Sequence, residues 1–136
     1  MGKFLKQYEI LYKKAKVDLN TAKVILESFE NGNIELDLEV VYFHLQQCAE
    51  KLVKALLDYK KIKFPHNHNI RELINIAYDN SIQIDNKEEL SQLTQYAVEG
   101  RYSIIHDDFD DTDIYIKILD TFLKSIDKEL NSRDIK

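Results

Sequence analysis

The sequence predicts an all-α protein, an up-and-down bundle of about five helices. Apolar residues recur at spacings of three and four along most of the chain, and only three Gly and one Pro interrupt its 136 residues. No stretch has the strict alternation of apolar and polar residues that is typical of a half-buried strand. The length and the 44% hydrophobic composition suit a single domain, residues 1–136, that folds without disulfides or metals.

The first two helices are predicted to be long. The first covers about residues 4–29 and ends at Asn31-Gly32-Asn33; its apolar positions are Phe4, Leu5, Tyr8, Leu11, Tyr12, Ala15, Leu19, Ala22, Ile25, Leu26 and Phe29. The second covers about residues 36–59 and ends before Pro65, which pushes the residue preceding it out of the helical region. Its stripe consists of Val40, Phe43, His44, Gln47, Cys48, Leu52, Ala55, Leu56 and Tyr59. We expect Cys48, which has no second cysteine to pair with, to be a buried structural side chain.

Three shorter helices are expected to follow. Asn69 and Glu72 have the spacing of a capping box and predict a helix that carries Ile70, Leu73, Ile74, Ala77 and Tyr78. Asp85 with Glu88, or Asn86 with Glu89, does the same for a fourth helix, whose apolar positions are Leu90, Leu93, Tyr96 and Ala97. Aspartates between positions 107 and 113 favour the start of a last helix, with Ile114, Leu119, Phe122, Leu123, Ile126 and Leu130 on its apolar side. Short connections should make consecutive helices neighbours.

Charge and hydropathy restrict the possible partners. The net charge is −5, and the acid excess lies in residues 64–136, which carry 15 Asp/Glu against 8 Lys/Arg. Such a domain is a poor general nucleic-acid binder, because counterion release needs clustered cations. RNA binding is therefore expected to be local, through Lys51, Lys54, Lys60, Lys61 and Lys63. No run of 18 apolar residues and no signal-peptide core is present, so we expect a cytoplasmic protein without a membrane partner.

Two segments and one residue pair resemble the HEPN family. Residues 42–57, YFHLQQCAEKLVKALL, are similar to its second-helix signature, approximately aromatic-His-x-Gln-Gln-small-x-Glu-Lys-x-x-Lys-Ala. Residues 64–70, FPHNHNI, resemble its Pro-x-x-His-x-hydrophobic stretch, and Arg101 with His106 has the spacing of its Arg-x(4–6)-His element. The resemblance covers roughly residues 10–130 and implies a HEPN-like helical domain that usually forms a homodimer. Many members are toxin partners of minimal nucleotidyltransferase antitoxins, and several resemble metal-independent ribonucleases.

The segment from Arg101 to His106 is the best candidate for a catalytic site. Metal-independent RNA cleavage needs a base for the 2′-hydroxyl proton, an acid for the leaving oxygen and a cation for the phosphate charge. His106 suits the base or the acid, and Arg101 suits the phosphate clamp. Five residues along a regular helix rotate by about 500°, which leaves these two side chains about 140° apart. We therefore expect either a distorted helix or a site completed by the same pair from a second subunit.

Five further residues are candidates for supporting the site or binding substrate: His44, Gln47, Lys51, Lys54 and Tyr102. His44 also fits a buried, hydrogen-bonded side chain that fixes helix packing. Lys51 and Lys54 are three residues apart, so they also fit a solvated helical face. The sequence departs from the strongest nuclease pattern, which has a polar residue after Arg and a Tyr two positions after His, where this chain has Tyr102 and Asp108. The nearby aspartates would repel phosphate, so Arg101 pairing with an aspartate and His106 capping a helix is the structural alternative.

Metal and cofactor sites are not expected. His66-x-His68 and His106-Asp107-Asp108 supply suitable ligand atoms, but capping explains the aspartates. The predicted function is a toxin-like component of a HEPN/nucleotidyltransferase pair, with metal-independent endoribonuclease activity. The alternative is a catalytically silent HEPN homodimer that binds a nucleotide or a nucleotidyltransferase partner. A third hypothesis is that the acidic segment docks onto a basic partner protein.

Overall fold

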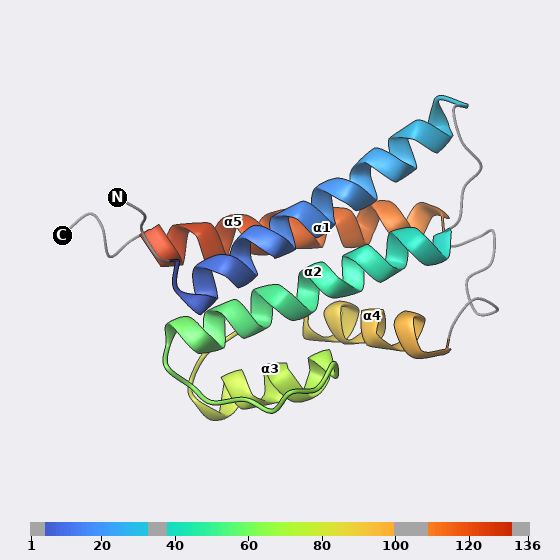
Figure 1. The fold of residues 1–136 in the computed structure, drawn as a ribbon. Helices are drawn as coiled ribbons and strands as arrows, with labels where there is room; N and C mark the ends of the chain where they lie inside the picture. Colours follow the sequence, from blue (N-terminus) through green and yellow to red (C-terminus); the bar gives the residue numbers. More distant parts are fainter. Residues whose placement is uncertain (1–4, 33–37, 100–108, 132–136) are drawn as a thin grey trace, which may run out of the picture.

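The computed structural model describes residues 5–32, 38–99 and 109–131, without the side chains of residues 38, 39, 95–99 and 109–111. All regular structure within these ranges is helical (Figure 1). The helices are α1 (Gln7–Glu30), α2 (Leu38–Tyr59), α3 (Ile70–Asp79), α4 (Lys87–Glu99) and α5 (Phe109–Asn131). The predicted all-helical bundle of about five helices is therefore confirmed.

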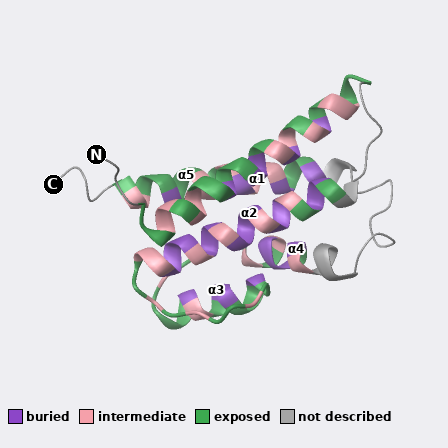
Figure 2. Ribbon diagram, in the orientation of Figure 1, coloured by how far each residue is buried: buried purple, intermediate pink, exposed green. Residues whose placement is uncertain are grey.

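Helix α2 is the centre of the bundle. It contacts each of the other four helices, while α1 also contacts α5 and α3 also contacts α4. Figure 1 shows α1 and α2 running side by side in opposite directions, with α3 and α4 on the far side of α2 from α1. Buried residues accordingly recur along α2 (Figure 2), and none of Val41, Leu45, Leu52 and Leu57 is exposed. None of the described helices is long and apolar enough to cross a lipid bilayer.

The start of α1 differs from the prediction. The apolar stripe begins at Phe4 and Leu5, but α1 begins at Gln7, and Leu5 lies before the helix with 40% of its surface exposed. The Glu9 carboxylate accepts a hydrogen bond of 2.9 Å from the backbone N–H of Lys6 and so caps the first turn. At the other end, Gly32 has a φ of +78° and donates its N–H to the Phe29 carbonyl at 2.9 Å.

The predicted caps of the short helices are confirmed in part. Asn69 Oδ1 accepts the Glu72 backbone N–H at 3.0 Å, which caps α3 as its spacing indicated. The Asn86 carbonyl accepts the Leu90 N–H at 2.9 Å and begins α4. The Arg71 guanidinium donates to both oxygens of the Glu88 carboxylate, at 2.9 and 2.7 Å. That ion pair ties α3 to α4 on the surface.

Cys48 lies in the middle of the core. Its side chain is completely buried, which confirms the structural role predicted for it. Burial, together with the negative charge of Asp18, raises the pKa of the Cys48 thiol well above its ordinary value. A protonated thiol without access to solvent is a poor nucleophile, so Cys48 is unsuited to catalysis in the folded protein.

Candidate functional site

The predicted catalytic pair lies in the connection between α4 and α5. Arg101, Tyr102 and His106 are outside the described residues, and so is the acidic stretch up to Asp108. Because α4 ends at Glu99 and α5 begins at Phe109, Arg101 follows α4 by two residues and His106 precedes α5 by three. Both helices pack against α2. The framework of the candidate site is therefore the end of the bundle where α2, α4 and α5 meet.

Tyr42 joins these helices at that end. Its hydroxyl accepts a hydrogen bond of 3.1 Å from Thr112 Oγ1, and both residues are buried. Its ring packs edge-on against Tyr115, with the centroids 5.7 Å apart. The Tyr115 hydroxyl in turn donates to Gln92 Oε1 at 2.6 Å. This chain of contacts connects α2, α5 and α4 within about two helical turns of the ends that the candidate segment joins.

Asp18 on α1 binds two of the predicted supporting residues. The Asp18 carboxylate lies 3.0 Å from His44 Nδ1 and accepts a hydrogen bond from Lys51 Nζ. The side chains of Asp18, His44 and Lys51 are 11%, 24% and 22% exposed. His44 is thus hydrogen-bonded and largely buried, as its place on the apolar stripe predicts. Asp18 thus holds both side chains, partly buried, between α1 and α2.

Glu50 on α2 is the centre of a second polar cluster. Although Glu50 is only 4% exposed, it accepts hydrogen bonds from Gln46 Nε2 at 2.9 Å and from Lys54 Nζ at 2.8 Å. His68 Nδ1 lies 3.0 Å from both carboxylate oxygens. Burial acts to raise the pKa of the Glu50 carboxyl, but these hydrogen bonds and the charge of Lys54 outweigh it, so the pKa lies below its ordinary value. Glu50 is therefore an anion that its neighbours stabilise.

Gln47 lies between the two clusters. Its side-chain amide donates a hydrogen bond of 2.9 Å to Gln46 Oε1, and Gln46 in turn donates to Glu50. His44, Gln47, Lys51 and Lys54 follow one another at spacings of three and four, and all are partly buried. The structure therefore brings four of the predicted supporting residues together on one face of α2, which we call the α2 polar face.

The interpretation of Lys51 and Lys54 as a solvated face was wrong. Lys54 is only 13% exposed and forms an ion pair with Glu50, while Lys51 pairs with Asp18. Lys60, another cation predicted to serve RNA binding, pairs with Glu129 at 3.1 Å. The carboxylates neutralise these lysines and fix their positions. The face thus offers ordered hydrogen-bond donors rather than an excess of positive charge.

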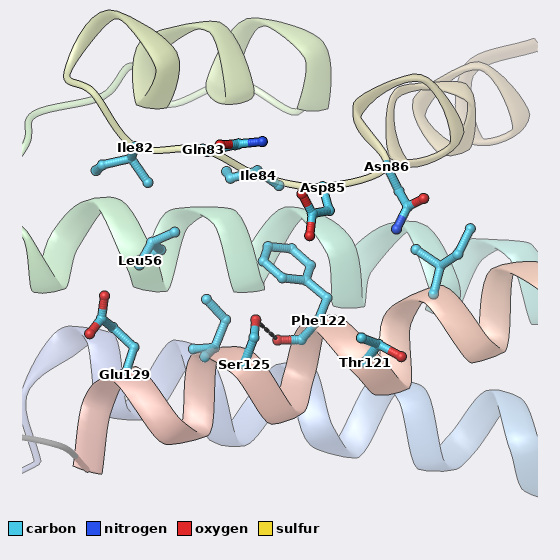
Figure 3. A pocket seen from close by; sticks show the side chains of 12 residues that line it. Leu56, Ile82, Gln83, Ile84, Asp85, Asn86, Thr121, Phe122, Ser125 and Glu129 are labelled. Carbon is cyan, nitrogen blue, oxygen red and sulfur yellow. Dashed lines mark hydrogen bonds between the residues drawn. The ribbon is translucent and has the colours of Figure 1, made fainter.

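A separate hollow lies between α5, the end of α2 and the connection from α3 to α4 (Figure 3). It has a volume of about 280 Å³ and contains none of the predicted site residues. Leu56 and Phe122 contribute apolar surface to it. Two of its polar groups are bonded within the chain, because Ser125 Oγ donates to the Phe122 carbonyl at 2.7 Å and Glu129 pairs with Lys60. We assign no role to this hollow.

Family comparison agrees with this architecture. The family model described as "HEPN domain" matches residues 8–130. The chain belongs to the HEPN family. The matched range contains the α2 polar face, both carboxylates that hold it and the connection between α4 and α5. HEPN domains are in general associated with nucleases and toxins, and they often dimerise. Comparison with curated proteins and with solved structures finds no match.

Two residues of this HEPN domain that organise the polar face were not among the predicted site residues. Asp18 and Glu50 hold every cation of that face, and both are almost fully buried. The sequence could have indicated that Asp18 is buried, because this residue lies three positions after Ala15 and four before Ala22, on the buried side of α1. A carboxylate at such a position needs a cation from another element.

One of the histidines weighed as metal ligands, His68, has a different partner in this HEPN domain. His68 faces Glu50 rather than His66. His106 and its neighbouring aspartates lie outside the described residues. Among the residues that the structure describes, no group of three or more His, Cys, Asp or Glu side chains is placed to hold a metal ion.

The ionised Glu50 should make the stability of the protein dependent on pH. A carboxyl whose pKa is lowered by folding stabilises the protein above its unfolded pKa, near 4.5, and loses that contribution as the pH falls through the lower folded pKa. We expect Glu50→Gln to be less stable than the wild type at neutral pH, with a smaller decline in unfolding free energy below pH 4.5. Urea denaturation across an acidic pH series measures both quantities.

Glu88→Gln is the matched control for that comparison. Glu88 also has a pKa lowered by an ion pair, with Arg71, but both side chains lie on the surface. Solvent screens such a pair, so this variant should follow the wild-type pH dependence closely. An identical acid dependence in Glu50→Gln and the wild type would contradict the role given to Glu50.

Proposed function

We propose that this HEPN domain is the toxin-like component of a HEPN/nucleotidyltransferase pair and that it cleaves RNA without a metal ion in the cytoplasm. The observation that carries the proposal is the position of the Arg-x4-His element. It lies between two helices that pack on α2; the hydrogen bond from Tyr115 to Gln92 links these two helices, and Tyr42 links α5 to α2. Reactive groups need such a rigid framework on both sides to reach a productive arrangement.

The reaction is an in-line transfer at phosphorus. One imidazole removes the proton of the 2′-hydroxyl, the 2′-oxygen bonds to phosphorus, and the bond to the 5′-oxygen breaks as an acid protonates that oxygen. Arg101 binds the phosphate oxygens and stabilises their charge as it develops. A single His106 supplies only one of the two proton-transfer groups in a given step. We therefore propose a homodimer in which the partner's His106 supplies the other.

The α2 polar face is proposed to position the substrate. His44 and Lys51 are fixed by Asp18, and Lys54 is fixed by Glu50, so their donors are ordered before any ligand binds. Because the carboxylates balance the lysine charges, the contribution expected from this face is orientation through hydrogen bonds rather than attraction of phosphate from a distance. Gln47 and Tyr102 complete the proposed set.

Expression of wild-type and His106→Ala proteins in a bacterium tests the function. We expect the wild type to arrest growth and degrade RNA, and the variant to do neither. With purified protein in excess EDTA, the variant should cleave RNA about 10² to 10⁴ times more slowly, as expected for loss of a proton-transfer group. His66→Ala, which changes an exposed histidine, is the control and should retain activity. Equal growth and equally intact RNA with wild type and His106→Ala would refute the enzyme.

A second function is favoured by the sequence of the connection itself. Tyr102 and Asp108 replace the polar residue and the tyrosine of the strongest nuclease pattern, and five aspartates lie between positions 107 and 113. These features favour a catalytically silent HEPN homodimer that binds a nucleotide or a nucleotidyltransferase. Retention of a nucleotidyltransferase from the neighbouring reading frame by wild-type and His106→Ala proteins alike, with no RNA cleavage by either, would select this function.

A further inference from the structure

We propose that the end of the bundle opposite the candidate site is a docking surface for the phosphate backbone of RNA, formed by Lys13, Lys14, Lys16, Lys61 and Lys63. We call these five residues the basic end. The proposal rests on the proposed function in one respect, since it takes RNA as the polyanion that the domain binds. It goes beyond that function because the basic end shares no residue with the α2 polar face or with the connection between α4 and α5.

Two segments far apart in the sequence form the basic end. Figure 1 shows the start of α1 beside the end of α2, where the Tyr8 and Tyr59 rings pack edge-on with their centroids 5.1 Å apart. Residues 6–16 and 58–68 carry seven lysines against two carboxylates. The remaining residues carry 12 Lys/Arg against 22 Asp/Glu. Positive charge is therefore concentrated at this end of an acidic protein.

The five lysines of the basic end keep their charge available to a ligand. All of them are exposed, and none forms an ion pair with the residues that the structure describes. Lys51 and Lys54 differ from them, because carboxylates balance both of those charges. A lysine without such a partner can neutralise a phosphate and release the counterions that are condensed on the nucleic acid.

The backbone at Lys61 supplies a second observation. The Ile62 N–H donates to the Leu57 carbonyl at 2.9 Å. The Lys61 N–H donates to the Asp58 carbonyl, also at 2.9 Å, so the two bonds together end α2 in a Schellman motif. Lys61 has a φ of +63°, which glycine adopts at this position without steric cost. A lysine weakens the turn, and no ion pair within the described residues offsets the loss, which favours an external partner for its charge.

The candidate site itself is poorly suited to attract phosphate. Five aspartates lie between positions 107 and 113, next to His106, and like charges repel. Attraction of phosphate must therefore come from another part of the domain. Helix α2 has 22 residues and separates the two ends by about 33 Å. The expected ligand is an RNA chain that reaches both ends, which requires about ten nucleotides at the spacing of a stacked strand, about 3.4 Å.

Fluorescence anisotropy of a labelled single-stranded RNA of about 30 nucleotides is the first experiment. The full-length His106→Ala chain in excess EDTA keeps the RNA intact. Adding Lys61→Gly/Lys63→Gln to it should weaken binding about tenfold and reduce the slope of log affinity against log salt by about 1.4, for two phosphate contacts. Lys117→Gln, which changes an exposed lysine on α5, is the control and should keep the affinity. Equal affinities with and without the double substitution, or no binding by either chain, would overturn the proposal.

Lys61→Gly separates a binding role from a structural one. Because glycine suits the left-handed conformation, this variant should unfold at the same or a higher urea concentration than the wild type, yet bind RNA about threefold more weakly. Ser81→Gly is the matched control, since Ser81 has a φ of +64° and ends α3 with the same pair of hydrogen bonds. It should keep the wild-type affinity. Full affinity in Lys61→Gly would contradict the role given to Lys61.

Cleavage distinguishes failure of the basic end from failure of the enzyme. Lys61→Gly/Lys63→Gln should lower kcat/KM about tenfold for the long RNA and leave the cleavage of a fragment of about four nucleotides unchanged. Equal kcat/KM for the long RNA in this variant and the wild type would overturn the basic end. If the wild type cleaves nothing and its RNA binding still depends on these lysines, the enzyme is refuted and the basic end is supported.

Vesicles that contain phosphatidylserine test whether the surface binds a membrane instead. We expect the double substitution to reduce RNA binding, and we expect neither the wild type nor the variant to sediment with the vesicles. Sedimentation of the wild type that the substitution abolishes, with unchanged RNA binding, would assign the surface to a membrane and overturn the proposal.

Discussion

Lys54→Met is expected to lower the free energy of unfolding by about 2–3 kcal/mol, because it leaves the buried Glu50 carboxylate without its ammonium partner. Lys54 Nζ lies 2.8 Å from Glu50 Oε2, and only 6% of the Glu50 side chain is exposed. Gln46 and His68 remain as partners, so the carboxylate keeps part of its stabilisation. Urea denaturation at neutral pH, compared with the wild type, measures the loss.

A second substitution separates the lost pairing from lost packing. Replacing both members, in Glu50→Met/Lys54→Met, removes the buried charge as well as its partner, and this variant should be more stable than Lys54→Met alone. Such a reversal is the signature of an uncompensated charge. If the double variant is the less stable of the two, the effect of Lys54→Met comes from packing and the interpretation of the ion pair is wrong.

Tyr42→Ala is expected to destabilise the protein by about 3–5 kcal/mol, the range found when a large buried aromatic side chain is truncated. Tyr42 is 1% exposed, packs on the Tyr115 ring and accepts the hydrogen bond of Thr112. Its removal opens a void where α2 meets α5. Denaturation by heat and by urea should both show the loss, and the proposed RNA cleavage should fall with it.

Two controls calibrate the result for Tyr42. Tyr42→Phe keeps the ring and removes only the hydroxyl that accepts from Thr112, so it should cost about 1–2 kcal/mol. Phe43→Ala removes a neighbouring aromatic ring that is 50% exposed and should cost clearly less than Tyr42→Ala. Similar losses for Tyr42→Ala and Phe43→Ala would mean that the contact between α2 and α5 is not the cause.

The helices could be predicted because their evidence is local. The helical course of α2 and the Asn69 cap each depend on residues of one segment, and both agree with the structure. The apolar stripe predicted for α2 was wrong at Val40 and Phe43, which are exposed while Val41, Tyr42 and Leu45 are buried. The predicted start of α1 was too early, because apolar residues continue upstream of the helix. The first residue of a helix is set instead by the groups that satisfy the free N–H groups of its first turn. Here that group is the Glu9 carboxylate, which accepts from Lys6.

The electrostatics of the site could be predicted only in part. Lys54 follows Glu50 by four residues on one helix, a spacing that favours pairing and is visible in the sequence. Lys51 instead pairs with Asp18, which is 33 residues away on α1. Contacts between helices depend on the relative rotation and register of the two helices. The spacing of residues along one helix contains no information about either. For this reason Lys51 was interpreted as solvated.

The position of Cys48 has a practical consequence for measuring how this bundle opens. It is the single cysteine of the chain and is sealed in the middle of the core on the helix that contacts all the others. A thiol reagent should therefore label it only from molecules whose core has opened. The labelling rate, followed as denaturant is added, would report the population of open molecules without any engineered probe.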